Sequence, residues 1–286
     1  MTDCESTQRG ELVTVLETGT TDLIGRIEGH VAVLSFNRPE TRNALSDDVY
    51  AGFGRALPVI ANDPNIRVLM VTGEGSAFCS GGDVKGMNQA NQARSGASVS
   101  MEARIDRLRH IQGQVSLAFR TLPQPVVAAL PGAAAGAGLS IALAADLRIA
   151  AERAIIMTAF ANVGASGDFG SSWFLPRIVG EAKAKELLFT TPRLSAREAA
   201  DLHIINKVLP DEDFAEAALN WCHDLAERAP IALRYMKENI NRAGDVSLKA
   251  ALDAEAVGMM RTLSTADHRE AAAAFVEKRA PKFSGQ

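Results

Sequence analysis

The sequence predicts an α/β protein in which one large mixed core precedes a helical C-terminal region. Three observations predict this class. Apolar runs of strand length alternate with segments of helical spacing up to about residue 210. Two of these runs, 66–72 and 126–130, lead into glycine-rich turns that precede new segments. From residue 211 onward almost every segment has helical spacing, so we expect a core over 11–210, a helical region over 211–286 and a disordered segment over 1–10.

Composition excludes several classes of function. The chain has 286 residues, of which 47% are hydrophobic, and it can therefore bury a large core. Its net charge is −4 with the two signs interspersed, which gives no basic surface for nucleic acid or an anionic membrane. The three cysteines lie far apart, and the acidic N-terminal stretch has no secretory signal. We therefore expect a cytoplasmic globular protein with no disulfide framework and no membrane span.

The elements follow from local patterns. Apolar runs bounded by turn residues predict strands at 12–17, 23–28, 31–36, 66–72, 126–130, 146–151, 155–158 and 206–209. Ser46 is a favoured N-cap, and a helix after it would bury Val49, Phe53, Leu57 and Ile60. Further helices are expected over 102–121, 139–145, 181–189, 195–202, 212–229, 231–241, 248–263 and 266–278. The polar stretch 88–100 and the glycine-laced stretch 160–172 are expected to be loops.

The stretch 126–147, VVAALPGAAAGAGLSIALAADL, is the part around which the chain is organised. It predicts a buried strand, a tight turn of tiny residues and a helix without a polar face. The first N–H groups of a helix have no intrahelical partner, and small residues let a ligand approach them, as an oxyanion hole requires. Close packing of two elements would need the same small residues, so the pattern alone leaves both interpretations open.

Several catalytic classes lack their motifs. The third glycine of a dinucleotide fingerprint would fall on Ile141, and no phosphate-binding loop follows a glycine run. The five histidines are scattered without metal-ligand spacing. Ser140 lies inside an apolar helix with no nucleophile elbow around it. An acidic residue, Asp168, stands in a loop of Gly, Ala, Ser and Phe, where it could act on a proton or cap a helix that begins near Ser171.

Four segments together resemble the enoyl-CoA hydratase/isomerase, or crotonase, superfamily. They are FNRP at 36–39 with RNAL at 42–45, AFCSGGDVK at 77–85, PVVAA from residue 125 continuing to Gly138, and LSAREA at 194–199. The resemblance covers about residues 22–280 and implies a crotonase (ClpP-like) spiral of ββα units with a C-terminal helical trimerisation region. It also implies acyl-CoA thioester substrates, with CoA as part of the substrate, no separate cofactor and no metal. A homotrimer or a dimer of trimers is expected, because the last helices carry apolar stripes.

The resemblance places the family's two oxyanion donors on the backbone N–H groups of Gly82 and Ala137. It also places the two glutamates of the hydratases on Ser140 and Phe160, so both carboxylates are missing here. Neither side chain can supply a tunable proton for the addition of water. A hydratase mechanism therefore lacks its acid and its base.

The stretch from 158 to 177 instead resembles the enoyl-CoA isomerases of the superfamily, especially the ring-opening isomerases of phenylacetate degradation. There one carboxylate, at the place of Asp168, moves a proton between C4 and C2. Phe160, Trp173 and Ser140 are then expected in the substrate pocket, and Arg38 and Lys85 near the CoA phosphates. Phe160 would raise the pKa of Asp168 by desolvation. A hydratase and a non-catalytic acyl-CoA-binding protein are the alternatives; a dehalogenase fits less well, because Phe160 is not Trp.

Overall fold

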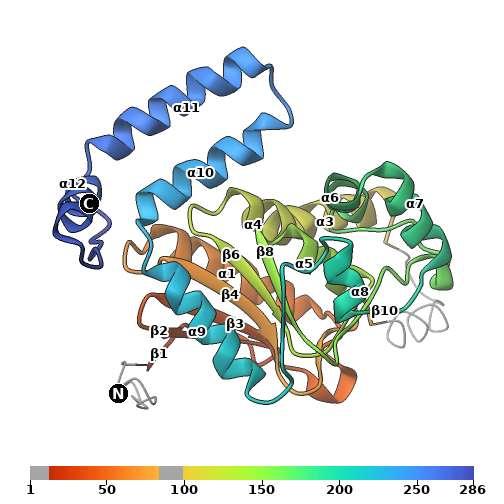
Figure 1. Cartoon of the computed structure of the whole chain (residues 1–286). Coiled ribbons are helices and arrows are strands. Elements are labelled where there is room, and N and C mark those ends of the chain that lie inside the picture. Colours follow the sequence, from red (N-terminus) through yellow and green to blue (C-terminus); the bar gives the residue numbers. More distant parts are fainter. Residues whose placement is uncertain (1–12, 84–98) are drawn as a thin grey trace.

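The computed structural model describes residues 13–83 and 99–286, so the expected disordered segment 1–10 and most of the expected loop 88–100 lie outside the described residues. Helices cover both faces of a twisted sheet, and the last helices extend away from it (Figure 1). This mixed arrangement confirms the predicted α/β class.

Strands in the described ranges form two sheets. The larger has the order β1-β2-β3-β4-β6-β8-β11, with bounds β1 Val13–Val15, β2 Leu23–Glu28, β3 Val31–Phe36, β4 Val68–Gly73, β6 Val126–Leu130, β8 Leu147–Ala151 and β11 Lys207–Leu209. Its first three strands are antiparallel and the others pair in parallel. The smaller has the order β10-β9-β7-β5, with β5 Ala77–Cys79, β7 Ala133–Ala135, β9 Ile155–Met157 and β10 Leu194–Ser195.

The helices follow the expected spacing closely. Their bounds are α1 Asp47–Asn62, α3 Met101–Gln112, α4 Ala118–Thr121, α5 Ala137–Ala144, α6 Ser171–Val179, α7 Glu181–Thr190, α8 Ala196–Asp201, α9 Phe214–Ala226, α10 Pro230–Ala243, α11 Leu248–Leu263 and α12 Ala266–Glu277. Short 3-10 turns, η1 Pro39–Thr41 and η3 Ala161–Val163, and a π-helical segment, η2 Gly113–Leu117, complete the set. The Ser46 hydroxyl caps α1 by accepting from the Val49 N–H at 3.2 Å, as predicted.

The core lies on both faces of the larger sheet. In β3, Ala32, Leu34 and Phe36 pack into one apolar cluster and Val31 and Val33 into another. The first cluster fills the space toward α1 and the smaller sheet, and the second lies under α9. Because both faces are covered, these strands are continuous apolar runs without polar alternation.

Helix α5 is buried at every position, which confirms that it has no polar face. Two short strands within the glycine-rich turns, β5 and β7, are missing from the sequence prediction, because a strand of three residues gives too little periodicity to detect. The predicted helix over 102–121 is interrupted by the π-helical segment. Ile105 and Leu108, which belong to the apolar spacing that predicted this helix, are 42% and 41% exposed in the single chain.

Helix α10 makes several polar contacts with the core. Lys237 on α10 forms an ion pair with Asp146 (2.7 Å) and donates to the Phe119 carbonyl (2.8 Å). Arg120 and Asn241 exchange two hydrogen bonds between α4 and α10, at 2.9 and 2.8 Å. Helix α11 returns alongside α10 and α12 follows near the C-terminus (Figure 1). None of the described helices combines the length and apolar character needed to cross a membrane.

Candidate active site

The two glycine-rich turns lie side by side because the strands before them are paired. β5 and β7 are parallel, with Ala77 opposite Ala133 and Cys79 opposite Ala134. The backbones beyond these strands approach closely: a methyl group on Gly138 would lie 2.3 Å from the Cys79 carbonyl oxygen. A methyl group on Gly81, whose φ is +91°, would lie 3.2 Å from the Ala137 nitrogen. The structure therefore brings the Gly82 turn against the start of α5.

Each proposed oxyanion donor has a defined place. Ala137 is the first residue of α5, where N–H groups have no partner within the helix. Gly82 forms an isolated parallel bridge with Leu45, whose N–H donates to the Gly81 carbonyl at 2.9 Å. The bridge fixes the turn beside the start of α1. The roles of the two N–H groups stay a prediction.

A buried asparagine organises the loop beside this turn. The Asn43 amide is 1% exposed and donates to the carbonyls of Glu74 and Ala77 at 3.0 and 2.8 Å. Its side-chain oxygen accepts from the Arg38 N–H at 2.8 Å. The RNAL motif thus ties the loop after β3 to the strand before the Gly82 turn, which explains one polar residue of the motif structurally.

Asp168 lies on a turn between η3 and α6. Its backbone carbonyl accepts from the Ser171 N–H at 3.0 Å, but α6 is capped by Gly170 without a side-chain hydrogen bond. The capping interpretation of the Asp168 side chain is therefore wrong. The carboxyl Oδ1 atom is buried and accepts no hydrogen bond from any described residue. A buried carboxyl oxygen without a partner is rare in proteins and typical of reactive sites.

Burial raises the pKa of Asp168 from 3.8 to about 6. Its charge is felt at two neighbouring groups, Tyr50 and Cys79, whose pKa values are raised first by burial and then by Asp168, that of Cys79 to about 12. Cys79 directly precedes the turn of Gly81, and its sulfur accepts from the Gly81 N–H at 3.4 Å. The charge of the carboxyl group therefore acts on Cys79, the residue that leads into the turn of Gly82, and its pKa is suited to proton transfer near neutral pH.

Phe160 stands between the two parts of the site. It is 8% exposed, and its ring lies 3.9 Å from the place of a methyl group on Gly136 and 4.0 Å from that of one on Gly167. Gly136 precedes the proposed donor Ala137, and Gly167 precedes Asp168. These contacts place Phe160 beside the residue that precedes Asp168, and its effect on the carboxyl group stays a prediction.

Ser140 is buried in α5 at 1% exposure, and its hydroxyl donates to the Gly136 carbonyl at 3.2 Å. The hydroxyl is thus bonded to the backbone at the start of its own helix. This hydrogen bond does not test whether Ser140 lines the substrate pocket, which stays a prediction.

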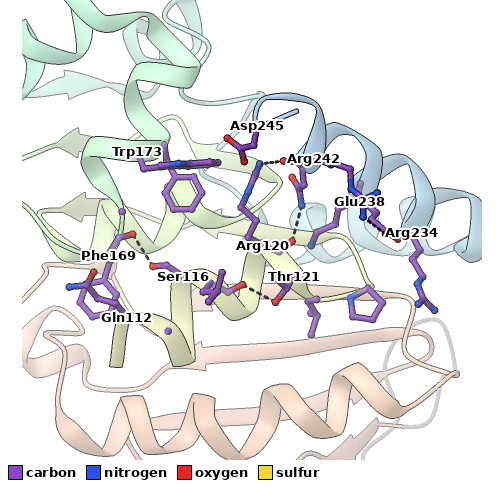
Figure 2. A pocket seen from close by; sticks show the side chains of 18 of the residues that line it. Gln112, Ser116, Arg120, Thr121, Phe169, Trp173, Arg234, Glu238, Arg242 and Asp245 are labelled. Carbon is purple, nitrogen blue, oxygen red and sulfur yellow. Dashed lines mark hydrogen bonds and ion pairs between the residues drawn. The ribbon is translucent and has the colours of Figure 1, made fainter. Parts of the chain in front are cut away.

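Trp173 lines a cavity of about 880 Å³ between α4, the start of α6 and α10 (Figure 2). The guanidinium carbons of Arg177 and Arg120 lie 3.7 and 4.4 Å from the centre of its ring. Phe169 and Gly170 line the same cavity, so it borders the turn that carries Asp168.

Arg38 and Lys85 are the two residues expected near the CoA phosphates, and the structure describes the first of them. The Arg38 guanidinium donates to the Ala44 carbonyl at 2.7 Å and lies 3.4 Å from Asp22 and 4.0 Å from Asp83. These contacts give it a structural role in the loop. Lys85 lies outside the described residues. Among the residues described, no three His, Cys, Asp or Glu side chains gather as a metal site would require.

Four residues around Asp168 were not predicted from the sequence as part of the site: Tyr50, Cys79, Ser116 and Phe169. Tyr50 and Phe169 stack with ring centres 5.7 Å apart, and Ser116 donates to the Phe169 carbonyl at 2.8 Å. No local pattern reveals them, because α1, η2, β5 and the 168–170 turn meet only in the folded chain.

Comparisons with known proteins agree with this architecture. Residues 26–286 match the family model described as enoyl-CoA hydratase/isomerase. A 1,2-epoxyphenylacetyl-CoA isomerase of Escherichia coli (strain K12) is 34% identical over 92% of this chain and 98% of its own length. A short-chain-enoyl-CoA hydratase of Clostridium acetobutylicum is 32% identical over 88% of this chain and 93% of its own.

A solved structure extends the likeness to three dimensions. The crystal structure of an enoyl-CoA hydratase from Polaromonas sp. JS666 is 38% identical and superposes with a TM-score of 0.84, covering 92% of this chain and 99% of that one. The chain belongs to the enoyl-CoA hydratase/isomerase family and has the crotonase fold. The predicted superfamily and fold are thereby confirmed.

Proposed function

We propose that this protein is an enoyl-CoA isomerase that moves a double bond of an acyl-CoA thioester from position 3 to position 2. The observation that carries the proposal is Asp168, a carboxyl group with a buried, unpartnered oxygen close to the turn of Gly82. A shift of a double bond needs one group that accepts a proton and returns it elsewhere. A single carboxyl group with a pKa near 6 can do both at neutral pH.

The reaction divides between two sets of groups. Asp168 removes a proton from C2, and the electrons move toward the thioester oxygen to form an enolate. The N–H groups of Gly82 and Ala137 hydrogen-bond to that oxygen as its charge develops. Asp168 then delivers the proton to C4, which leaves the double bond between C2 and C3. Asp168 ends the cycle ionised, as it began, and the acyl chain keeps its total number of protons.

Phe160 supports this assignment over hydration. Its ring fills the space between Gly136 and Gly167, where the resemblance expects a carboxylate in the hydratases. An apolar ring holds no water in position for attack, and it keeps the Asp168 carboxyl desolvated. The isomerase relative, at 34% identity, and the hydratase relatives, at 32% and 38%, are about equally similar, so the proposal rests on the site residues; a ring-containing acyl group fits it as well as a linear one.

The test is to incubate the protein and its Asp168→Asn variant with a 3-enoyl-CoA in heavy water and to follow products by mass spectrometry. We expect a conjugated 2-enoyl product that gains no water, formed about 10²–10⁴ times more slowly by the variant. Deuterium at C4 of this product measures how often the proton held by Asp168 exchanges with solvent before its return. A 3-hydroxyacyl product in the wild type would establish a hydratase instead. Recovery of unchanged, undeuterated substrate from both proteins would favour an acyl-CoA-binding role.

We further propose that the protein assembles as a homotrimer or a dimer of trimers through its C-terminal helices. Apolar side chains of α11 are at least half exposed in the single chain, at Leu248, Leu252, Val257 and Met260. Surfaces of this kind are buried in oligomers. Light scattering should give three or six times the mass of one chain, and Met260→Glu should lower that mass; a wild-type monomer would contradict the proposal.

A further inference from the structure

The backbone that carries Asp168 is held in an unfavourable conformation. Phe169 has a φ of +47°, in the left-handed region that L-residues with side chains avoid. Such a residue persists only where its surroundings hold it. Since Phe169 directly follows Asp168, its torsion angles help to set where the carboxyl group points.

Two kinds of contact hold Phe169. Its ring is 1% exposed and stacks on the Tyr50 ring from α1, with the ring planes 20° apart. Its carbonyl accepts a 2.8 Å hydrogen bond from the Ser116 hydroxyl (Figure 2). The ring contact anchors the side chain, whereas the hydrogen bond acts on the peptide group after Phe169 and so restrains the torsion angles directly.

Ser116 reaches this carbonyl from an unusual segment. It lies in the π-helical turn Gly113–Leu117, between the fully buried Val115 and the 61% exposed Leu117. A π-helical turn changes which side chains face the core, and such turns occur frequently at functional sites. Ser116 itself is 5% exposed, so water has little access to replace its hydrogen bond.

We propose that Ser116 is a positioning residue for Asp168, whose hydroxyl holds the Phe169 carbonyl and thereby fixes the left-handed turn that directs the carboxyl group into the site. The proposal rests on the function proposed above for Asp168. The groups whose charge state is coupled to Asp168 are Tyr50 on α1 and Cys79 on β5, and both stay protonated near neutral pH because burial raises their pKa values. A change in the titration of Asp168 would therefore report on its own placement.

The test compares Ser116→Ala with Thr121→Ala. Thr121 is the control for loss of a nearby hydroxyl, because it is exposed on α4 and its hydroxyl donates locally, to the Leu117 carbonyl at 2.9 Å. In Ser116→Ala we expect kcat to fall about tenfold with KM within about twofold, since the acid–base group is displaced while thioester binding is kept. Ser116→Thr, which keeps the hydroxyl, should recover much of the loss.

A second measurement does not depend on turnover. Carbon NMR of protein labelled at the aspartate carboxyl carbons gives the titration of Asp168, assigned by its absence in Asp168→Asn. We expect the midpoint in Ser116→Ala to lie about half a pH unit or more below that of the wild type, because a displaced carboxyl group is better solvated. A Ser116→Ala protein that titrates and turns over like Thr121→Ala would overturn the proposal. If the wild type fails to isomerise 3-enoyl-CoA, the proposed function is wrong, and the NMR comparison still decides the role of Ser116.

Discussion

The two sides of the candidate site are built on different principles. On one side, the Gly82 turn and the start of α5 offer backbone N–H groups, and their positions depend on strands that pair in parallel and on backbones in close contact. On the other side, Asp168 offers a side chain whose properties depend on burial and on a turn held by Phe169 and Ser116.

Because of this difference, the two sides should tolerate different substitutions. A backbone donor should survive replacement of its side chain provided that the new atoms fit, and the methyl group of Ala137 fits in a helix start where every residue is buried. A carboxyl group survives no replacement, because its chemistry lies in the side chain. The first side should therefore be sensitive to added volume and the second to the removal of particular groups.

The largest effect expected on the backbone side comes from Gly138→Ala. The added methyl group would lie 2.3 Å from the Cys79 carbonyl oxygen, so the Gly82 turn and α5 must separate. Loss of one oxyanion donor costs roughly 10²–10³ in kcat, and we expect a loss of this size in isomerase assays.

Gly244→Ala is the matched control, because nothing lies within 4 Å of the added methyl group and the residue follows α10. It should retain wild-type activity. Ala137→Gly should also retain activity near the wild-type level, since it keeps the N–H group. If Gly138→Ala keeps full activity with an unchanged melting temperature, the close backbone contact is unimportant for the site.

An intermediate effect is expected from the pH dependence of the acid–base side. Asp168 must be ionised to accept a proton, so kcat/KM of the wild type should fall as the pH drops below about 6. Phe160→Ala admits water beside the carboxyl group and should lower its pKa, moving this acid limb to lower pH. Phe160→Leu retains an apolar cover and should keep the limb near that of the wild type; an unmoved limb in Phe160→Ala would show that Phe160 does not control Asp168.

The smallest effect concerns stability. The pKa of Asp168 is higher in the folded chain than its ordinary value of 3.8, so the folded state binds the proton more tightly. Stability is therefore lost as the pH rises from 3.8 to about 6 and is not regained above it. The Asp168→Asn variant removes this cost. Because the carboxyl group is only partly buried, the gain is small, and we expect the melting temperature of the variant to exceed that of the wild type by roughly 1–3 °C at pH 8.

The same comparison at pH 4 should show little difference, because the carboxyl group is then largely protonated in the folded state. Calorimetry at both pH values checks this. A variant less stable than the wild type at pH 8 would mean that the carboxylate stabilises the fold, and would argue against a desolvated base.

The sequence indicated the glycine turns and Asp168 as places of interest, because glycine runs and an acidic residue in an apolar loop stand out locally. It left open whether the small residues near Gly138 serve packing or catalysis, and the structure shows the packing contact directly. It also allowed Asp168 to cap α6, which the structure contradicts. The choice between hydratase and isomerase chemistry depends on the absence of carboxylates at Ser140 and Phe160. Only the resemblance to the family shows that carboxylates are expected there, because no periodicity reveals it.

By itself the sequence determined the order of the longer elements, the Ser46 cap and the fully buried character of α5, since each depends on neighbours within a few residues. Only the tertiary structure decided that β5 lies against β7, that the charge of Asp168 acts on Tyr50 and Cys79, and that Ser116 reaches a carbonyl 53 residues away. The physical reason is that close backbone approach and desolvation arise from segments distant in the chain. Neither exists until those segments pack together.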